Sequence, residues 1–468
     1  MRQKSLLQVL LTLLLAVAFV SPAAAEIKLP TIIGDNMVLQ REMPVPIWGW
    51  AEPKEKISVT FDNQSVATIA DKDGKWKITL KELKASADPK GMAIRGDKSE
   101  PVDLKNILVG EVWVCSGQSN MEWPMTRTAK SAEEIEAAKY PEIRLFKLPK
   151  TQANEPQDNC PGSWSECSPA TVKDFSAVGF FFGRHLYKDL GVPIGLIRTA
   201  WGGTPAENWT KKEILESHDI LKPLVGRGSK LYNAMIHPLI PFAIRGAIWY
   251  QGESNCSRAF QYRTLFPAMI KNWRDDWGQG DFPFGFVQLA PFRYGRQDPA
   301  CCAELWEAQV MTLKGLPNIG MAVTTDITTL RNIHPPNKQD VGLRLGLWAM
   351  ATVYGKKDLV YSGPIYKSMK VEGDKIRLEF DHTGGGLASS DGKPLIDFTI
   401  AGEDQKFEPA TAAIDGKTIV VQSDKVNNPV AVRFGWYDTA TPNLINKECL
   451  PASPFRTDSW KGVTEPKE

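Results

Sequence analysis

The residues with the clearest chemical potential lie in the segment VWVCSGQSNMEW, residues 112–123. Its apolar first half predicts a buried strand that stops abruptly at a short polar turn carrying Ser119. A hydroxyl at the open end of a sheet, beside unpaired backbone N–H groups, supplies what acyl transfer needs, a nucleophile and oxyanion donors. Ser119 is the candidate nucleophile and Ser116 a weaker competitor. The alternative is that Ser119 only caps the following turn or helix.

This turn differs from the nucleophile elbow of α/β-hydrolases. That motif has the form Gly-x-Ser-x-Gly, whereas Met121 stands here at the position of the second glycine. The sequence therefore requires a different serine-hydrolase design.

A serine nucleophile needs a base, and the chain has five histidines. We favour His334, in the segment IHPPNK, because it lies in a loop after the predicted strand Ile319 to Thr324 and directly before a predicted helix. From there its side chain can reach the Ser119 turn. His237 is the main rival, since it also stands in an Ile-His-Pro sequence. The alternative for His334 is a helix-start histidine bonded to backbone.

An imidazole base also needs a partner that fixes its tautomer and stabilises the imidazolium. Two carboxylates are candidates. Asp326 ends the strand that leads to His334, and Glu253 lies in the segment QGESN at the end of another predicted strand. Glu253 has the alternative role of holding loop N–H groups.

Oxyanion stabilisation requires preorganised donors. The candidates are the backbone N–H of Ser119, the backbone N–H of Gly203 or Gly202, and the side-chain amide of Asn255. Glycine lets the backbone approach a ligand closely. Losing one such donor typically costs on the order of 10²–10³ in rate, so several are expected together.

These residues fall in a region where apolar runs alternate with helical patterns. The predicted strands are Ile107 to Cys115, Gly195 to Thr199, Ala243 to Tyr250, Phe284 to Leu289 and Ile319 to Thr324; the predicted helices are Ala132 to Ala138, Phe175 to Leu190, Tyr262 to Trp277, Ala303 to Leu313 and Asp340 to Tyr354. The alternation predicts a three-layer α/β domain with its active site at the carboxyl ends of the strands.

Short alternating runs before and after this region predict two flanking β domains. We expect an N-terminal β domain over 26–106, the α/β domain over 107–358 and a C-terminal β domain over 359–460. Residues 1–25 have a charged start, an apolar centre and a small-residue end, which is typical of a cleaved secretory signal. A secreted or periplasmic protein is therefore expected, with no later segment long enough to span a membrane.

Composition excludes some functions. With 56 basic and 54 acidic residues, the chain has no net field that favours nucleic acid. No clustered His or Cys-x-x-Cys pattern predicts a metal site, and no cofactor is expected. Among seven cysteines, Cys160 and Cys167 are the expected disulfide pair in an oxidising compartment.

Four motifs in this order resemble the sialate O-acetylesterase family of the SGNH hydrolase superfamily. They are GQSNM at 117–121, WGGTPAENW at 201–209, YQGESN at 250–255 and IHPPNK at 333–338. The resemblance implies a flavodoxin-like α/β/α catalytic domain flanked by β domains, and removal of acetyl groups from sugars. It implies Ser119 as nucleophile, Gly203 (or Gly202) and Asn255 as oxyanion donors, and His334 as base. We also expect Gln118, Trp201 and Gln251 to bind substrate.

One position departs from the pattern. Many SGNH enzymes place the acid three residues before the histidine, where this chain has Arg331, and relatives often have Asp where it has Asn332. Glu253 in the QGESN segment resembles the acid of related acetylxylan esterases, and Asp326 is the alternative. Asn332 could still bond the imidazole, although a neutral amide stabilises imidazolium less than a carboxylate does.

The expected partner is an acetylated oligosaccharide or sialic acid. Sialic acid would favour Arg or Lys in the pocket, whereas Trp123, Trp201 and Trp209 near the motifs favour neutral plant polysaccharide fragments modestly. The alternative functions are an SGNH esterase for other acyl groups and a glycan-binding protein that has lost catalysis.

Overall fold

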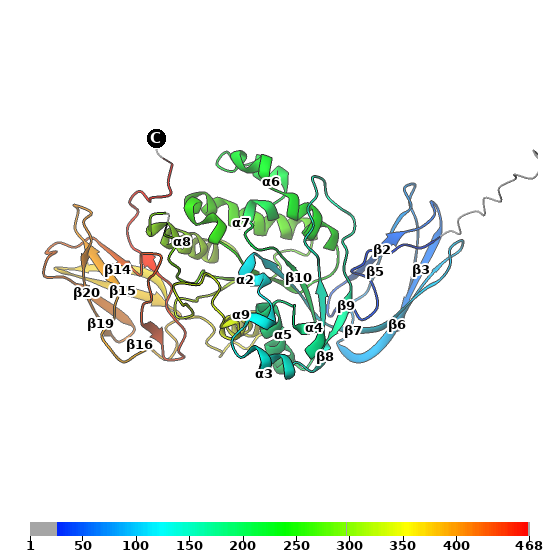
Figure 1. Cartoon of the computed structure of the whole chain (residues 1–468), viewed down its shortest axis with the longest axis horizontal. Helices are drawn as coiled ribbons and strands as arrows, with labels where there is room; N and C mark the ends of the chain where they lie inside the picture. The colour runs from blue at the N-terminus through cyan, green and yellow to red at the C-terminus, as the bar shows by residue number, and fades with distance from the viewer. Residues whose placement is uncertain (1–25, 296, 467–468) are drawn as a thin grey trace, which may run out of the picture.

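The computed structural model describes residues 26–295 and 297–466. The chain is arranged as three parts in a row, with β structure at each end and an α/β part between them (Figure 1). The expected signal segment, 1–25, lies outside the described residues. Within the described ranges, no helix is both long enough and apolar enough to cross a bilayer.

The central sheet has the strand order β13-β12-β11-β7-β10-β8-β9. Its strands are β7 Val102–Gly117, β8 Tyr140–Lys147, β9 Trp164–Cys167, β10 Ile194–Ala200, β11 Gly246–Tyr250, β12 Phe284–Val287 and β13 Ile319–Ala322. All neighbours are parallel except the β8–β9 pair. Without β8 and β9, the order is that of a flavodoxin-like sheet. The predicted α/β class is confirmed.

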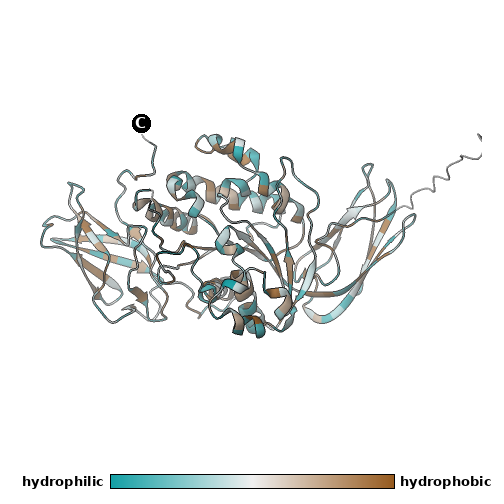
Figure 2. Ribbon diagram, in the orientation of Figure 1, coloured by the Kyte–Doolittle hydropathy of each residue, from teal (hydrophilic) through white to brown (hydrophobic). Residues whose placement is uncertain are grey.

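Helices cover both faces of this sheet, with α7 and α8 on one side and α5 and α9 on the other (Figure 1). The helices of this part are α2 Ser119–Glu122, α3 Ser131–Glu136, α4 Pro169–Val172, α5 Ala177–Leu190, α6 Lys212–Glu216, α7 Ala259–Trp277, α8 Ala300–Gly315 and α9 Lys338–Thr352. The strands are apolar along their length because both faces are covered. Apolar colour accordingly concentrates in the central strands, while the helices show both colours (Figure 2).

Strand β7 joins the first β part to the centre. The earlier strands are β1 Val38–Gln40, β2 Val45–Trp50, β3 Lys56–Phe61, β4 Gln64–Ile69, β5 Lys75–Leu80 and β6 Ser86–Gly96. The first half of β7 pairs with β6, and its second half lies between β10 and β11. The domain boundary expected at 106 therefore falls inside a continuous strand.

The last part of the chain forms further antiparallel β structure. Its strands are β14 Ile365–Glu372, β15 Lys375–Asp381, β16 Leu387–Ser389, β17 Phe398–Ala401, β18 Glu408–Pro409, β19 Thr411–Asp415, β20 Thr418–Gln422, β21 Ala431–Phe434, β22 Leu444–Asn446 and β23 Phe455–Arg456. They enclose a hydrophobic core of their own, which includes Ile376, Ile400 and Phe434.

The expected disulfide between Cys160 and Cys167 is wrong for this structure, because both thiols are free and buried. The Cys167 sulfur points to the carbonyl oxygen of Ala138, 3.9 Å away. The carbonyl of Cys160 instead accepts a hydrogen bond from the hydroxyl of Thr31. The loop between the two cysteines is thus tied at each end to a different neighbour.

Candidate active site

The three strands that carry the polar motifs end at the same level. Gly117, the last residue of β7, is paired with Ala200 of β10 on one side and Tyr250 of β11 on the other. Gly117 has a φ of +137°, and a Cβ there would lie 2.2 Å from the Tyr250 carbonyl oxygen. Only glycine allows this approach. The motifs therefore emerge together, where the chain order reverses across the sheet and ligands of such folds bind.

Ser119 is the first residue of α2 and is half-buried. It lines a cleft of about 420 Å³, and His334 lines the same cleft. In the described part of the chain, no hydrogen bond joins the Ser119 hydroxyl to the imidazole, and Asn332 accepts from the backbone N–H of His334 at 2.9 Å. The competitor Ser116 is fully buried in β7. The predicted nucleophile and base thus share one cavity.

The surroundings of His334 keep its imidazole neutral. The ring stacks on Trp123 with centroids 4.8 Å apart, and the exposed Arg127 lies 5.6 Å from the Trp123 ring centroid. Burial and the positive charges of Lys338 and Arg127 lower the pKa of His334 below its ordinary 6.5. Its Nε2 is buried and has no partner among the described residues. A neutral imidazole with a free nitrogen can accept a proton.

Glu253 lies behind the serine turn in a network that sequence reasoning missed. The Asn120 side chain donates to Glu253 Oε1 at 2.6 Å and to the carbonyl of Ile333 at 3.0 Å. Its own oxygen accepts from Lys338 Nζ at 2.5 Å. One amide therefore connects the serine, glutamate and histidine motifs.

Burial dominates the electrostatics of this network. It raises the pKa of Glu253, although the Asn120 hydrogen bond and the Lys338 charge act in the opposite direction. Burial also lowers the pKa of Lys338 to about 7, against the attraction of Glu253. The second oxygen of Glu253 has no partner among the described residues.

Asp326, the other candidate acid, is held elsewhere. Its two oxygens accept from the Arg344 guanidinium at 2.7 and 2.6 Å, in a bidentate pair with helix α9. Arg344 also donates to the carbonyl of Val323. Asp326 therefore fixes the end of β13 against α9, and no hydrogen bond to the imidazole of His334 occurs within the described residues.

The two glycine N–H groups proposed as oxyanion donors differ in whether they are free to bind a ligand. Gly202 lies against Ser119, since a Cβ on it would be 3.1 Å from the Ser119 Cβ, but its N–H already donates to Glu122 at 2.7 Å. Gly203 has a φ of +76°, and a Cβ there would have no neighbour within 4 Å. The Gly203 N–H is therefore the better candidate of the two.

The Asn255 amide is deeply buried and oriented by several bonds. Its oxygen accepts from the Ala206 N–H at 3.0 Å and from Gln251 at 2.7 Å, while its nitrogen donates to Glu207 at 3.0 Å. The NH₂ group keeps a second hydrogen for a ligand. Glu207 is itself paired with Arg258 at 2.8 Å. The Glu207 contact was missed, although this residue lies inside the WGGTPAENW motif.

The residues expected to bind substrate are placed differently. Gln251 is fully buried, with bonds to Asn255 and the Tyr262 hydroxyl, so it orients Asn255 and does not reach the cleft. Gln118 is also buried, and its oxygen faces the N–H groups of Gly252 and Ser254 at 3.4 Å. These amides hold loops together, and the expectation that they touch the sugar is not supported by their positions.

The tryptophans near the motifs separate into exposed and buried ones. Trp123 lines the cleft, and Trp201 is partly exposed with Lys150 Nζ 5.9 Å from its ring centroid. Trp209 is fully buried and donates to the Thr204 hydroxyl. Trp209 therefore offers no platform for a sugar.

Basic side chains dominate the charge of the cleft. Arg127, Lys147, Lys150 and Arg198 line it with only two acids, Glu122 and Asp174. Glu122 is paired with Lys150 at 2.6 Å and with Arg198 at 3.3 Å. The remaining positive charge favours an anionic group in the ligand. Sequence reasoning missed these cations because they come from separate segments.

Comparisons with known proteins agree with this geometry. The family model for carbohydrate esterases described as sialic acid-specific acetylesterases matches residues 109–347. The chain is 29% identical to the sialate O-acetylesterase of Homo sapiens over 489 residues, which cover 92% of this chain and 93% of that protein. The Mus musculus sialate O-acetylesterase is also 29% identical, over 94% of this chain and 96% of that protein. A solved carbohydrate acetylesterase from Xanthomonas citri is 42% identical with a TM-score of 0.87, covering 93% of this chain and 100% of that one.

Proposed function

Because the chain belongs to the carbohydrate esterase family of sialic acid-specific acetylesterases, we propose that Ser119 is the nucleophile with which it removes O-acetyl groups from sugars. The observation that carries this assignment is the cleft that Ser119, just after the end of β7, and His334, just before α9, line together. A nucleophile and a base at the open edge of a sheet are the minimum that acyl transfer requires.

In the first half of the reaction, Ser119 Oγ attacks the acetyl carbonyl carbon while His334 accepts the hydroxyl proton. The carbonyl oxygen becomes an oxyanion, which the N–H groups of Ser119 and Gly203 and the Asn255 amide stabilise. When the tetrahedral intermediate collapses, the sugar oxygen leaves and takes the proton from His334. An acetyl group then remains on Ser119.

In the second half, water replaces the sugar. His334 takes a proton from the water as its oxygen attacks the acetyl carbon, and the same donors hold the second oxyanion. Collapse breaks the bond to Ser119 Oγ, which recovers its proton from His334, and acetic acid is released as acetate.

We assign Glu253 as the carboxylate that supports His334, in preference to Asp326. Asn120 bonds both Glu253 and the residue before His334, whereas both oxygens of Asp326 are engaged by Arg344. Through Asn120 this buried carboxylate is connected to the backbone of the histidine loop, and a carboxylate on that side favours the imidazolium formed on proton transfer. Its charge is in turn supported by Lys338.

The substrate sugar that the cleft favours is an acidic one. Four basic side chains face two acids there, and Arg127 is exposed at the opening beside Trp123. A sugar carboxylate would be bound by these cations, while Trp123 and Trp201 offer apolar ring faces. O-acetylated sialic acid or a polysaccharide with acidic units therefore fits better than a purely neutral chain, and acetate release from O-acetylated sialic acid and from acetylated xylan should be compared directly.

The test of the nucleophile uses p-nitrophenyl acetate and the Ser119→Ala variant. We expect kcat to fall by at least about 10⁴-fold, because the covalent route is lost. Ser116→Ala is the matched control and should keep most of the activity, since Ser116 is buried. Undiminished turnover by Ser119→Ala would refute the assignment, and a series of longer acyl esters would reveal an esterase without acetyl preference.

We propose further that the protein acts outside the cytoplasm. The support is the signal-like composition of residues 1–25. N-terminal sequencing of the protein from its natural source should begin near Glu26; a chain that retains Met1 would exclude export by cleavage.

A further inference from the structure

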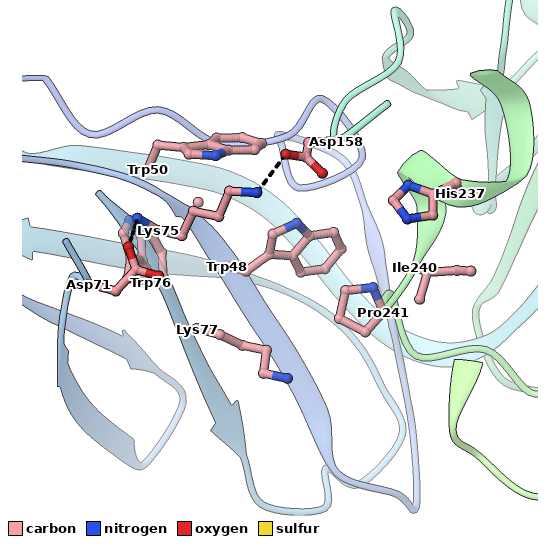
Figure 3. Close-up of a pocket in the computed structure, with 11 residues that line it drawn as sticks. Trp48, Trp50, Asp71, Lys75, Trp76, Lys77, Asp158, His237, Ile240 and Pro241 are labelled. Atoms are coloured by element: carbon pink, nitrogen blue, oxygen red, sulfur yellow. Dashed lines mark hydrogen bonds and ion pairs between the residues drawn. The ribbon is translucent and has the colours of Figure 1, made fainter. Parts of the chain in front are cut away.

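A second cavity of about 350 Å³ lies at the first β part of the chain, and it shares no lining residue with the Ser119 cleft. Strands β2 and β5 form one side of it, and the segment around His237 forms the other (Figure 3). Its volume is in the range of small-ligand sites. His237, the histidine of the second Ile-His-Pro sequence, lines this cavity and does not line the catalytic cleft.

Two tryptophans form the floor of the cavity. Trp48 and Trp50 alternate along β2 and therefore point to the same face of the strand. Across the strand pair, Trp48 is opposite Lys77 and Trp50 opposite Lys75. Both indoles are only partly buried. Large aromatic rings left open to solvent on one face are a recognised feature of binding surfaces.

The positive and negative side chains around the two tryptophan rings are equal in number. Lys75 Nζ is paired with Asp158 at 2.8 Å, above Trp48 in Figure 3. With Lys77 and Asp71, the cavity is lined by two basic and two acidic side chains. This lining has no excess charge, in contrast to the catalytic cleft, so it suits a neutral ligand with many hydroxyl groups.

The histidine adds an acceptor. His237 Nδ1 lies 2.9 Å from the carbonyl oxygen of Gln157, so this nitrogen carries the proton and Nε2 is left as an acceptor. Donors and acceptors thus surround two flat apolar faces.

We propose that this cavity binds a neutral oligosaccharide segment, whose ring faces stack on Trp48 and Trp50 while its hydroxyls bond Asp158, Lys75 and His237. The choice of a sugar rests on the proposed function, because a carbohydrate esterase meets glycan chains. An indole combines a large apolar face with a polar edge, which is the combination that a pyranose ring presents in turn. The site would hold a polymeric substrate at a distance from the reacting acetyl group.

The test measures binding of xylohexaose and cellohexaose to the full chain carrying Ser119→Ala, by titration calorimetry and tryptophan fluorescence. Trp48→Ala and Trp50→Ala are each expected to weaken binding by at least about ten-fold. Ile69→Ala is the matched control, since Ile69 is 65% exposed in the same β part and does not line the cavity. Asp158→Asn breaks the ion pair with Lys75 and keeps both tryptophans, so it is expected to weaken binding less than either tryptophan variant does.

Hydrolysis of p-nitrophenyl acetate tests the esterase, and hexasaccharide binding tests the second cavity, so either can fail alone. In a background with Ser119 intact, the two tryptophan variants should hydrolyse p-nitrophenyl acetate at the wild-type rate but show a raised KM for acetylated polysaccharide. Absence of binding by both neutral hexasaccharides, or equal binding by the tryptophan variants, overturns the inference even if the esterase is active. If the wild type releases no acetate while Trp48-dependent binding persists, the proposed function fails and the sugar site stands.

Discussion

At the scale of single residues, the protonation state of His334 is set by its neighbours. The ring is partly buried against Trp123, and the positive charges of Lys338 and Arg127 act on it. Each of these surroundings disfavours the imidazolium. His334 is therefore neutral, and able to accept a proton, at a lower pH than an exposed histidine would be.

This leads to a prediction about pH. The acidic limb of kcat/KM for p-nitrophenyl acetate should have its midpoint below 6.5, because the pKa of His334 is lowered and the neutral base survives at lower pH. Arg127→Gln removes a positive charge, so the pKa should rise and the limb should move to higher pH. Lys130→Gln, another exposed cation nearby, should leave it in place. A midpoint above 6.5, or an unmoved limb in Arg127→Gln, would contradict this explanation.

A second prediction separates the two carboxylates. Glu253→Gln keeps the shape of the side chain but removes its charge, and kcat should fall by about 10²–10⁴-fold with little change in melting temperature. Asp326→Asn should lower kcat by less than about 10-fold. It should instead destabilise the fold by on the order of 1–2 kcal/mol, because Arg344 is nearly buried and loses its partner. The reverse pattern would make Asp326 the acid.

The sequence predicts a site residue where a short motif defines its role, and it fails where the role arises from tertiary contacts. Ser119, His334 and Asn255 stand in motifs that predict their positions. Lys338 was not identified, because a lysine after Pro-Pro-Asn has the pattern of an exposed helix start, and its burial against Trp123 and Tyr250 arises only from tertiary contacts. Gln251 was assigned to substrate for a similar reason, since an amide in a motif does not reveal which way it faces.

At the scale of elements, the site depends on how closely the strand ends approach one another. Gly117 and Gly203 both have a positive φ near the nucleophile, but only Gly117 is in contact with another strand. The first glycine is required by packing and the second by backbone conformation alone.

The two glycines therefore give a matched pair of variants. Gly117→Ala should lower the free energy of unfolding by about 3 kcal/mol or more, because its Cβ would press on the Tyr250 carbonyl. Gly203→Ala should cost only about 1 kcal/mol and retain measurable esterase activity, since its N–H stays in place. Urea unfolding of both variants checks this; equal costs would show that the strand contact is not decisive.

The elements that the sequence predicted well are those with continuous apolar runs. The central strands and long helices lie within a few residues of their predicted limits. Strands β8 and β9 were missed, because β8 contains Pro141, Glu142 and Arg144 among its apolar residues. Arg144 is buried there by hydrogen bonds to the carbonyls of Asn36 and Asn106, which no local pattern reveals.

At the scale of the whole molecule, a buried carboxylate ties the first part of the chain to the central sheet. Glu111 of β7 is fully buried and accepts from Arg41 at 2.5 Å and from Arg245 at 2.7 Å. Arg41 follows β1, and Arg245 precedes β11. Three segments are thus joined at the end of the sheet opposite the catalytic turn.

Removing this charge should affect stability without affecting chemistry. Glu111→Gln leaves Arg41 and Arg245 with only the more exposed and more distant Glu42 as a shared anion, and it should lower the free energy of unfolding by about 3 kcal/mol. Asp103→Asn, which breaks an exposed pair with Arg95, should cost less than about 1 kcal/mol. Denaturant midpoints measure both, and similar small losses would mean that Glu111 contributes little to the junction.

Strand β7 begins inside one β sheet and ends at the catalytic turn. Removal of the chain before β7 would leave the first half of this strand without its partner β6. The N-terminal β part therefore cannot be exchanged as an independent domain. With the sugar site proposed above, a change of glycan preference would therefore require substitutions at places such as the Trp48 face, within a scaffold that cannot be divided before β7.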